Sequence, residues 1–243
     1  MTDSYCHLDV ECECPISDMQ ARMRAAAVTR VLLVETWNGR NRSLLEAVSQ
    51  SPDRDTFPVA LCYRPERQRE LNQLARAGRI VAIRISTADL PGREGFWRGL
   101  PDCGTALIAH AESGIGPLAA QLVELHRRVP KLRLYVPHLG WPGRDGQADP
   151  DWPAAIATLA AVPTVTLGVS AIAHFSTRPY PHDDVRELAL RVIASFPASR
   201  IVVGSDYPLF DKARYGDYLS LALDWVASVH PNWNDSIVLP LAP

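Results

Sequence analysis

The sequence predicts an α/β fold, a single (β/α)8 TIM barrel, because short apolar segments alternate with amphipathic ones and eight of each can be counted. Parallel strands need helical crossovers between them, and eight such units match a closed barrel with its helices outside. The 243 residues suit one small barrel, so we expect a single domain over residues 1–243. An open doubly wound sheet would carry a Gly-rich turn after its first strand, and this sequence has none.

The local pattern of apolar residues predicts each strand and helix. The expected strands are short runs rich in branched apolar residues, and several expected helices carry apolar residues three and four positions apart, as in Leu118, Leu122 and Leu125. The Pro/Gly-rich stretch 140–153 is expected to be a long loop, because the alternation resumes beyond it. The expected strands cover residues 4–8, 30–34, 58–62, 80–85, 106–109, 132–136, 164–169 and 201–203, and the expected helices cover 18–27, 42–49, 66–77, 96–100, 116–128, 152–161, 184–195 and 215–229.

Composition restricts the partners. The chain is 47% hydrophobic and 21% charged, as in ordinary globular proteins, and its net charge of -2 gives no electrostatic reason to bind nucleic acid or an acidic membrane. Its N-terminus is polar without a long apolar run, which predicts a cytoplasmic protein. Five cysteines make a poor disulfide framework, and Cys12 and Cys14 are expected to be free thiols. The oligomeric state stays open, a homo-oligomer included.

Asp206 is the first candidate for chemistry. It follows the apolar run Ile201–Val203 and a Gly-Ser pair, so it lies where a buried strand ends. The carboxyl ends of barrel strands carry the active site, and a carboxylate among apolar neighbours needs a cation or a donor. The alternative is structural, a turn or helix cap before Pro208.

Histidines end other strands. His7 lies at the end of the expected first strand, and His110 and His138 follow the fifth and sixth. Tyr5 shares a face with His7 because side chains alternate along a strand. With Asp206, these imidazoles suit zinc and related divalent ions. His174 and His182 lie in a segment rich in Pro and Arg, and we expect both in a solvated loop.

Arginine and tryptophan indicate the substrate. Arg64 and Arg84 follow or end strands, and the guanidinium fork binds carboxylates, so an anionic small molecule is favoured. Trp37 and Trp141 are candidates to line the pocket. The structural alternatives are that Arg84 pairs with a protein carboxylate such as Glu35 or Glu112, and that the tryptophans only pack.

Five segments resemble the amidohydrolase superfamily in order: DSYCHLD at residues 3–9, LIAHAE at 107–112, VPHLG at 136–140, TVTLGVS at 164–170 and GSDYP at 204–208. They are most similar to the branch with dicarboxylate lactonases and carboxylate decarboxylases. The resemblance implies a metal-dependent barrel enzyme, with His7 as the second His of the first-strand pair, His110 and His138 as the fifth- and sixth-strand histidines, and Asp206 as the eighth-strand Asp.

The chain departs from that pattern at Tyr5, which stands where the first histidine is expected. A neutral phenol is a poor zinc ligand. No lysine occurs on the fourth strand, so a two-metal site is not expected. The site therefore holds either one divalent metal, most naturally zinc on His7, His110 and Asp206, or none, as in lactonases of this group that work without metal.

Three hypotheses follow. The first is a hydrolase of a small carboxylate-bearing cyclic ester or amide, of the lactonase or amidase type. In it Asp206 activates water as general base, while His7, His110 and His138 bind a metal or polarise the carbonyl, aided by Tyr5. The second is a metal-dependent non-oxidative decarboxylase of a small carboxylic acid. The third is a non-catalytic barrel, which the replacement at Tyr5 favours.

Overall fold

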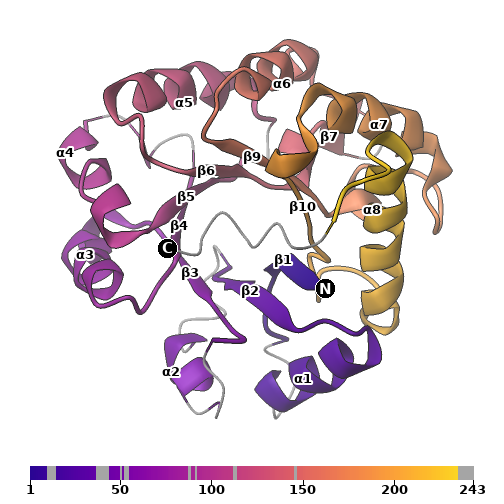
Figure 1. The fold of residues 1–243 in the computed structure, drawn as a ribbon, viewed down its shortest axis with the longest axis horizontal. Coiled ribbons are helices and arrows are strands. Elements are labelled where there is room, and N and C mark those ends of the chain that lie inside the picture. Colours follow the sequence, from indigo (N-terminus) through magenta and orange to yellow (C-terminus); the bar gives the residue numbers. More distant parts are fainter. Residues whose placement is uncertain are drawn as a thin grey trace.

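Eight parallel strands form a ring at the centre of the protein (Figure 1). The computed structural model describes residues 1–9, 15–36, 44–49, 51, 55–86, 89–90, 92–111, 114–144 and 147–234. Each strand pairs with the next along the chain, and the observed strands begin and end within two residues of the predicted ranges. The strands are β1 (Thr2–Cys6), β2 (Arg30–Val34), β3 (Val59–Cys62), β4 (Ala82–Ile85), β5 (Ala106–Ala109), β6 (Leu134–Val136), β9 (Val165–Val169) and β10 (Ile201–Val203).

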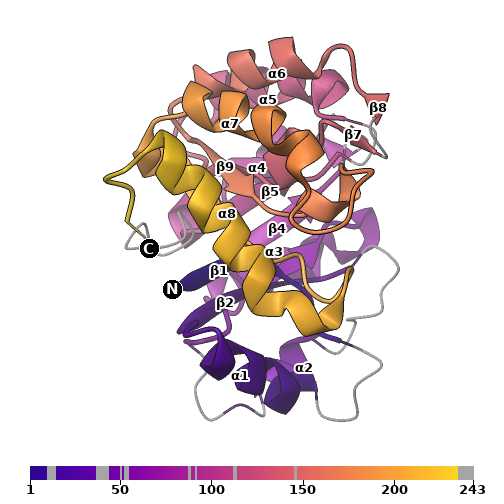
Figure 2. The ribbon, with the colours of Figure 1, turned by 90° about the vertical axis from the view of Figure 1, so that its right-hand side faces the viewer.

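Helices follow the strands and form the outer layer around the ring (Figures 1 and 2). This arrangement confirms the predicted (β/α)8 TIM barrel. The short helices are short for local reasons: α4 ends at Trp97 before the glycine and proline of Gly99–Pro101. The helices are α1 (Pro15–Ala25), α2 (Leu44–Ser49), α3 (Gln68–Arg76), α4 (Glu94–Trp97), α5 (Gly116–Arg128), α6 (Trp152–Ala160), α7 (Arg186–Ser195) and α8 (Tyr215–Val229).

The expectation of a loop over residues 140–153 was wrong in one respect, because part of this stretch forms regular secondary structure. A two-stranded antiparallel ribbon, β7 (Gly143–Arg144) with β8 (Gln147–Ala148), follows the sixth barrel strand. Strands of two residues are too short to show the apolar alternation from which strands are predicted.

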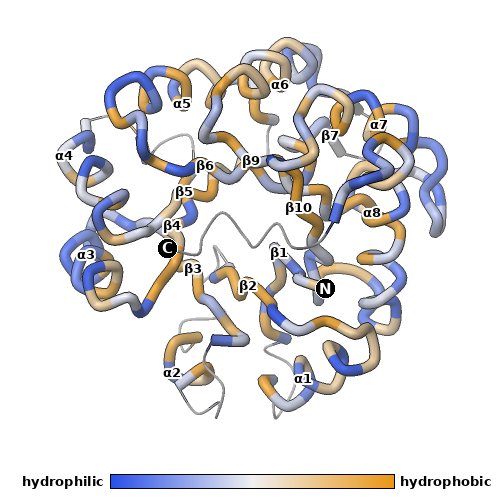
Figure 3. The backbone as a smooth tube through the Cα atoms, viewed as in Figure 1, coloured by the Kyte–Doolittle hydropathy of each residue, from blue (hydrophilic) through white to orange (hydrophobic). Residues whose placement is uncertain are grey.

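Two apolar clusters hold the fold together. The larger lies between the ring and the helices, where the apolar faces of both meet, and Figure 3 shows apolar residues on the strands and polar ones on the outer helix surfaces. The smaller cluster fills the ring, where the alanines of β3, β4 and β5 leave space for the rings of Tyr5 and Tyr135. Gly168 on β9 lies against the Tyr135 ring, where a Cβ atom would not fit.

The first and last strands meet through their backbones just above the ring. The Asp206 amide donates to the carbonyl of Tyr5 at 2.9 Å, and the His7 amide donates to the carbonyl of Tyr207 at 2.7 Å. Below them the buried carboxylate of Asp3 accepts from the Ser205 hydroxyl at 2.6 Å and the Ser205 amide at 3.0 Å. These contacts bring residues from opposite ends of the chain together.

Within the described residues, none of the helices combines the length and apolarity needed to cross a lipid bilayer. Cys6, Cys62 and Cys103 are free thiols. The prediction for Cys12 and Cys14 lies outside the described residues.

Candidate active site

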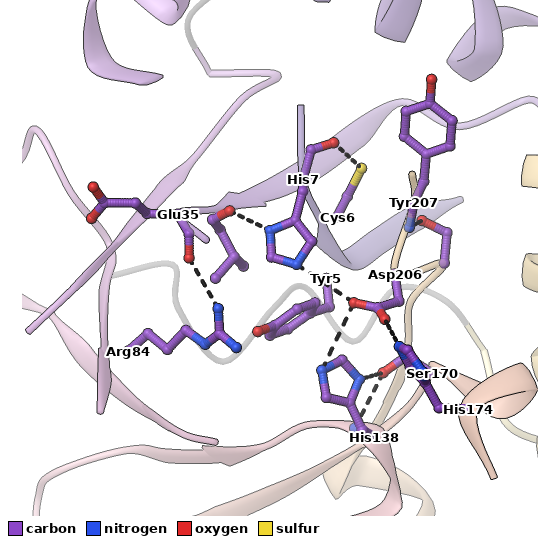
Figure 4. Close-up of polar contacts among 12 residues, drawn as sticks. Tyr5, Cys6, His7, Glu35, Arg84, His138, Ser170, His174, Asp206 and Tyr207 are labelled. Atoms are coloured by element: carbon purple, nitrogen blue, oxygen red, sulfur yellow. Dashed lines mark hydrogen bonds and ion pairs between the residues drawn. The ribbon is translucent and has the colours of Figure 1, made fainter. Parts of the chain in front are cut away.

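Asp206 lies at the carboxyl end of β10 with its side chain surrounded by three imidazoles (Figure 4). Its oxygen Oδ1 is 3.6 Å from Nε2 of His7 and 3.8 Å from Nε2 of His138, and its oxygen Oδ2 is 3.6 Å from Nε2 of His174. The residue is only 1% exposed. Burial by itself would raise the pKa of Asp206, but His138, His174 and His7 outweigh burial and hold this pKa well below its usual range. The carboxylate of Asp206 is therefore ionised at neutral pH.

The backbone at the site is held in an unusual conformation. Asp206, His138 and Trp141 have φ values of 58°, 57° and 58°, in the left-handed region. Such residues cost about 1–3 kcal/mol each and persist where the surrounding structure over-determines them. At Asp206 the fixed partner is the carbonyl of Tyr5, which accepts from the Asp206 amide. This turn directs the carboxylate toward His7 and His138.

His7 follows β1, and its two ring nitrogens face different partners. Nδ1 lies 2.6 Å from the carbonyl oxygen of Val34, which can only accept, so Nδ1 carries a proton. Nε2 faces Oδ1 of Asp206 (Figure 4). In the neutral ring Nε2 presents a lone pair, so two acceptors converge on the space between His7 and Asp206.

His138 follows β6 and is held by the residue that ends β9. The Ser170 hydroxyl contacts the His138 amide at 3.2 Å and Nδ1 of the ring at 2.9 Å (Figure 4). Burial lowers the pKa of His138 well below its usual value, although the charge of Asp206 opposes it. The ring is therefore neutral, with Nε2 toward Asp206.

Three further predicted residues pack around these groups. Tyr5 is fully buried, and its ring centroid lies 4.4 Å from that of His138 in an edge-to-face contact. The buried ring of His110 lies 5.4 Å from His138 and 5.5 Å from Trp141, also edge to face. Trp141 in turn packs against His174 at 5.3 Å. The structure thus brings the ends of β1, β5, β6, β9 and β10 to one place.

Two predicted arginines lie at neighbouring strand ends. Arg84 on β4 is 4% exposed, its guanidinium carbon lies 6.0 Å from the centre of the Tyr5 ring, and its charge helps to lower the pKa of His138. Arg84 donates to the backbone carbonyl of Glu35 at 3.1 Å, whereas the Glu35 carboxylate accepts from Arg67. Arg64 follows β3 and is half-buried. Trp37 and Glu112 lie outside the described residues.

The expectation of a solvated loop for two histidines was wrong. His174 ends a short 3-10 helix, η5 (Ile172–His174), and contacts Asp206. His182 is 5% exposed, donates from Nδ1 to the carbonyl of Arg178 at 2.8 Å and stacks on Tyr218. The sequence did carry one signal that His174 lies near the site, which is its position five residues after the seventh strand. Pro and Arg content does not report whether tertiary contacts cover a loop.

The described residues do not fit the metal site that the resemblance implied. Among them, no group of three or more His, Cys, Asp or Glu side chains is arranged to hold a metal ion. The donor set gives a reason, since Tyr5 contributes a buried phenol where the resemblance implies the first histidine of the first-strand pair.

Comparisons with known proteins agree with this fold. A probable 2-pyrone-4,6-dicarboxylic acid hydrolase from Acinetobacter baumannii, with citric acid bound, has a TM-score of 0.69 and 17% identity, over 97% of this chain and 94% of that one. An amidohydrolase from Burkholderia multivorans with bound zinc has a TM-score of 0.71 and 18% identity, over 97% and 93%. Amidohydrolase 2 from Bifidobacterium longum subsp. infantis has a TM-score of 0.63 and 16% identity, over 96% and 93%.

At these identities the solved structures establish the fold alone, and no curated protein matches the chain. The family assignment comes from the sequence model described as Amidohydrolase, which matches residues 11–229. Because that match spans nine-tenths of the chain and includes every histidine around Asp206 except His7, the protein belongs to the amidohydrolase family and is a hydrolase of that superfamily.

Proposed function

We propose that the protein hydrolyses a small cyclic ester that bears a carboxylate, with Asp206 as the general base. The observation that carries the proposal is the buried, ionised carboxylate of Asp206 with three imidazole nitrogens within 3.6–3.8 Å. A positioned base with hydrogen-bond donors beside it is what water activation and oxyanion stabilisation require.

Nε2 of His7 and Oδ1 of Asp206 are placed to hold the attacking water together. Nε2 of His7 and Oδ1 of Asp206 are 3.6 Å apart, and both accept when the His7 ring is neutral. A water molecule that donates one hydrogen to each keeps its lone pairs free for a carbonyl carbon. Asp206 then takes the proton as the new C–O bond forms, and the ring C–O bond breaks. The proton passes to the leaving oxygen, which yields an open-chain hydroxy acid.

His138 offers a donor for the developing oxyanion. Nε2 of His138 lies 3.8 Å from the same carboxylate oxygen, and the Tyr5 and His110 rings pack against His138. Donors fixed where negative charge develops stabilise the transition state more than the ground state. We assign this role to His138, with His110 and Tyr5 as its neighbours in the pocket.

The positive charges at the ends of β3 and β4 favour an anionic substrate. The buried guanidinium of Arg84 acts on His138 through its charge, so a bound carboxylate near it would sit next to the reacting carbonyl. Arg64, which follows β3, adds a second positive charge at a neighbouring strand end, and Trp141 packs against His138. The hydrolase from Acinetobacter baumannii is named for a cyclic ester with two carboxylates, and 2-pyrone-4,6-dicarboxylate is therefore the first substrate to test.

The test is a panel of carboxylated lactones, with 2-pyrone-4,6-dicarboxylate first, and of aromatic carboxylic acids. The loss of ultraviolet absorbance measures ring opening, and CO2 release is measured in parallel. Ring opening without CO2 supports the proposal. CO2 release would instead support the decarboxylase. If no compound in the panel reacts, carboxylated lactones are not the substrate class.

A further inference from the structure

We propose that Ser170 is a positioning residue that fixes His138 in the tautomer with its proton on Nε2. This role is separate from the contacts that bind substrate, because Ser170 acts on the far side of the ring. Its catalytic consequence rests on the proposed function, in which Nε2–H of His138 donates to the oxyanion. The tautomer itself can be measured without any substrate.

The hydrogen-bond partners of the Ser170 hydroxyl determine which nitrogen of His138 carries the proton. Ser170 is 1% exposed, so its hydroxyl depends on protein partners. The backbone amide of His138 can only donate, so Ser170 Oγ accepts from it, at 3.2 Å. The hydroxyl proton then needs an acceptor. Within the described part of the chain, the other hydrogen bond of this oxygen goes to Nδ1 of His138, at 2.9 Å.

Nδ1 is therefore the acceptor of the Ser170 proton, which assigns the proton of the neutral ring to Nε2. That nitrogen lies 3.8 Å from Oδ1 of Asp206 and on the side of the ring that faces this carboxylate (Figure 4). An N–H group in this position faces the carboxylate in the free enzyme and can donate to a substrate oxygen during the reaction. The opposite tautomer would offer a lone pair to both, and would repel them.

His7 shows that the site distinguishes its histidines. The Val34 carbonyl holds the His7 proton on Nδ1, whereas the Ser170 hydroxyl holds the His138 proton on Nε2. The two rings thus present an acceptor and a donor to the same oxygen of Asp206. Because of this asymmetry, water gives up its proton on the side of His7, and the substrate oxygen receives a hydrogen bond on the side of His138.

The backbone explains why a serine at the end of β9 can reach His138. β6 and β9 are paired neighbours, with Val136 opposite Leu167, so their carboxyl ends lie side by side. Directly after Ser170 the chain turns through Ala171, whose φ is 57°, into η5. Ser170 is thus held between the strand and this turn.

The first experiment is nitrogen NMR of the wild-type protein labelled with 15N-histidine, with the His138 signals assigned by comparison with His138→Gln. We expect His138 to show a protonated Nε2 and an unprotonated Nδ1. A protonated Nδ1 in the wild-type protein would overturn the proposal. This measurement needs neither a variant at Ser170 nor turnover, so its outcome is independent of the proposed function.

The second experiment compares Ser170→Ala with Ser170→Thr, which keeps the hydroxyl, and with Ser4→Ala, a buried serine that bonds Tyr135 instead. We expect Ser170→Ala to move the His138 proton toward Nδ1 and to lower kcat for 2-pyrone-4,6-dicarboxylate by about ten- to a hundredfold, with a smaller change in KM. Ser170→Thr should retain the tautomer and most of kcat, and Ser4→Ala should retain the tautomer. An unchanged tautomer in Ser170→Ala would overturn the assignment, and a changed tautomer with unchanged kcat would overturn its catalytic role.

Discussion

His174 Nε2 lies 3.6 Å from one carboxylate oxygen of Asp206, while the other oxygen faces His7 and His138. The side chain of His174 is 22% exposed, whereas those of His7 and His138 are 3% and 2% exposed. Its ring is held by Trp141 at 5.3 Å and by Phe210 at 4.2 Å. His174 is thus the partner of Asp206 on the solvent side of the site.

Replacing His174 tests whether this contact matters to the reaction. His174→Gln should lower kcat about tenfold, because a hydrogen bond to a charged carboxylate contributes about 1.5–3 kcal/mol, part of which the glutamine amide can replace. Steady-state kinetics with 2-pyrone-4,6-dicarboxylate measures the effect. His126→Gln, in which the replaced histidine bonds Thr164 on the outside of the barrel, is the control. Equal rates in the two variants would contradict a role for His174.

Removing the charge of Asp206 should cost much more. Asp206→Asn keeps the shape of the side chain but cannot accept a proton from water, so kcat/KM should fall by about 10²- to 10⁴-fold. Asp102→Asn, at an exposed position, should leave kcat/KM unchanged. Circular dichroism checks that both variants are folded. An Asp206→Asn variant with wild-type kcat/KM would rule out this residue as the base.

Restoring the histidine that the family pattern lacks should create a zinc site. Tyr5→His adds an imidazole beside those of His7 and His138. The ring centroids of these two residues lie 5.4 and 4.4 Å from that of Tyr5. After zinc loading and dialysis, elemental analysis should find about one zinc per chain in the variant and much less in the wild-type protein. Stoichiometric zinc in the wild-type protein would contradict this prediction.

Stability should depend on the protonation of Asp3, which bonds β10 to β1. Burial raises the pKa of Asp3 to about 6, although hydrogen bonds from Ser205, Tyr5 and Tyr215 oppose it. The folded protein therefore binds this proton more tightly than the unfolded chain does. The resulting stabilisation, on the order of 3 kcal/mol at most, is complete below the unfolded pKa and is lost as the pH rises through about 6.

Urea unfolding of the wild-type protein and of Asp3→Asn between about pH 5 and about pH 8 measures this dependence. The wild-type protein should lose stability relative to Asp3→Asn as the pH rises, while Asp102→Asn should follow the wild-type curve. Parallel curves for the wild-type protein and Asp3→Asn would show that Asp3 does not titrate in this range.

The interior of the ring should not tolerate a methyl group at Gly168. A Cβ atom there would lie 2.7 Å from Cε2 of Tyr135, which cannot move easily in a filled barrel. Gly168→Ala should lower the free energy of unfolding by about 1–3 kcal/mol. Gly95→Ala, where no atom lies within 4 Å of the added methyl, is the control. Combining Gly168→Ala with Tyr135→Leu should recover part of the loss, and no recovery would argue against this clash.

The barrel and much of its rim could be predicted from the sequence because both depend on local patterns. Alternation of apolar and amphipathic segments reports strand and helix directly, and equal strand direction then places His7, His110, His138 and Asp206 at one end. Strand positions were correct within two residues. The two-residue difference at β1 matters, because the strand ends at Cys6 and leaves His7 beyond it, while Tyr5 stays within the strand.

Contacts between loops could not be predicted in this way. The local pattern places His174 in a loop, and only the fold brings it within 3.6 Å of the Asp206 carboxylate. The same holds for the bond between Asp3 and Ser205, which joins residues 202 positions apart. No local pattern encodes such a pair, since its partners are neighbours only after the ring has closed.

The sequence by itself determined the strand order and the rim residues, since these follow from residue type and spacing. Its resemblance to the amidohydrolase superfamily identified Tyr5 as a departure from the family pattern. Tertiary structure alone decided which nitrogen of each histidine faces Asp206, because that depends on a carbonyl of β2 for His7 and on the hydroxyl of Ser170 for His138. Hydrogen-bond partners from neighbouring strands set the orientation and protonation of each ring, and those partners meet only in the folded chain.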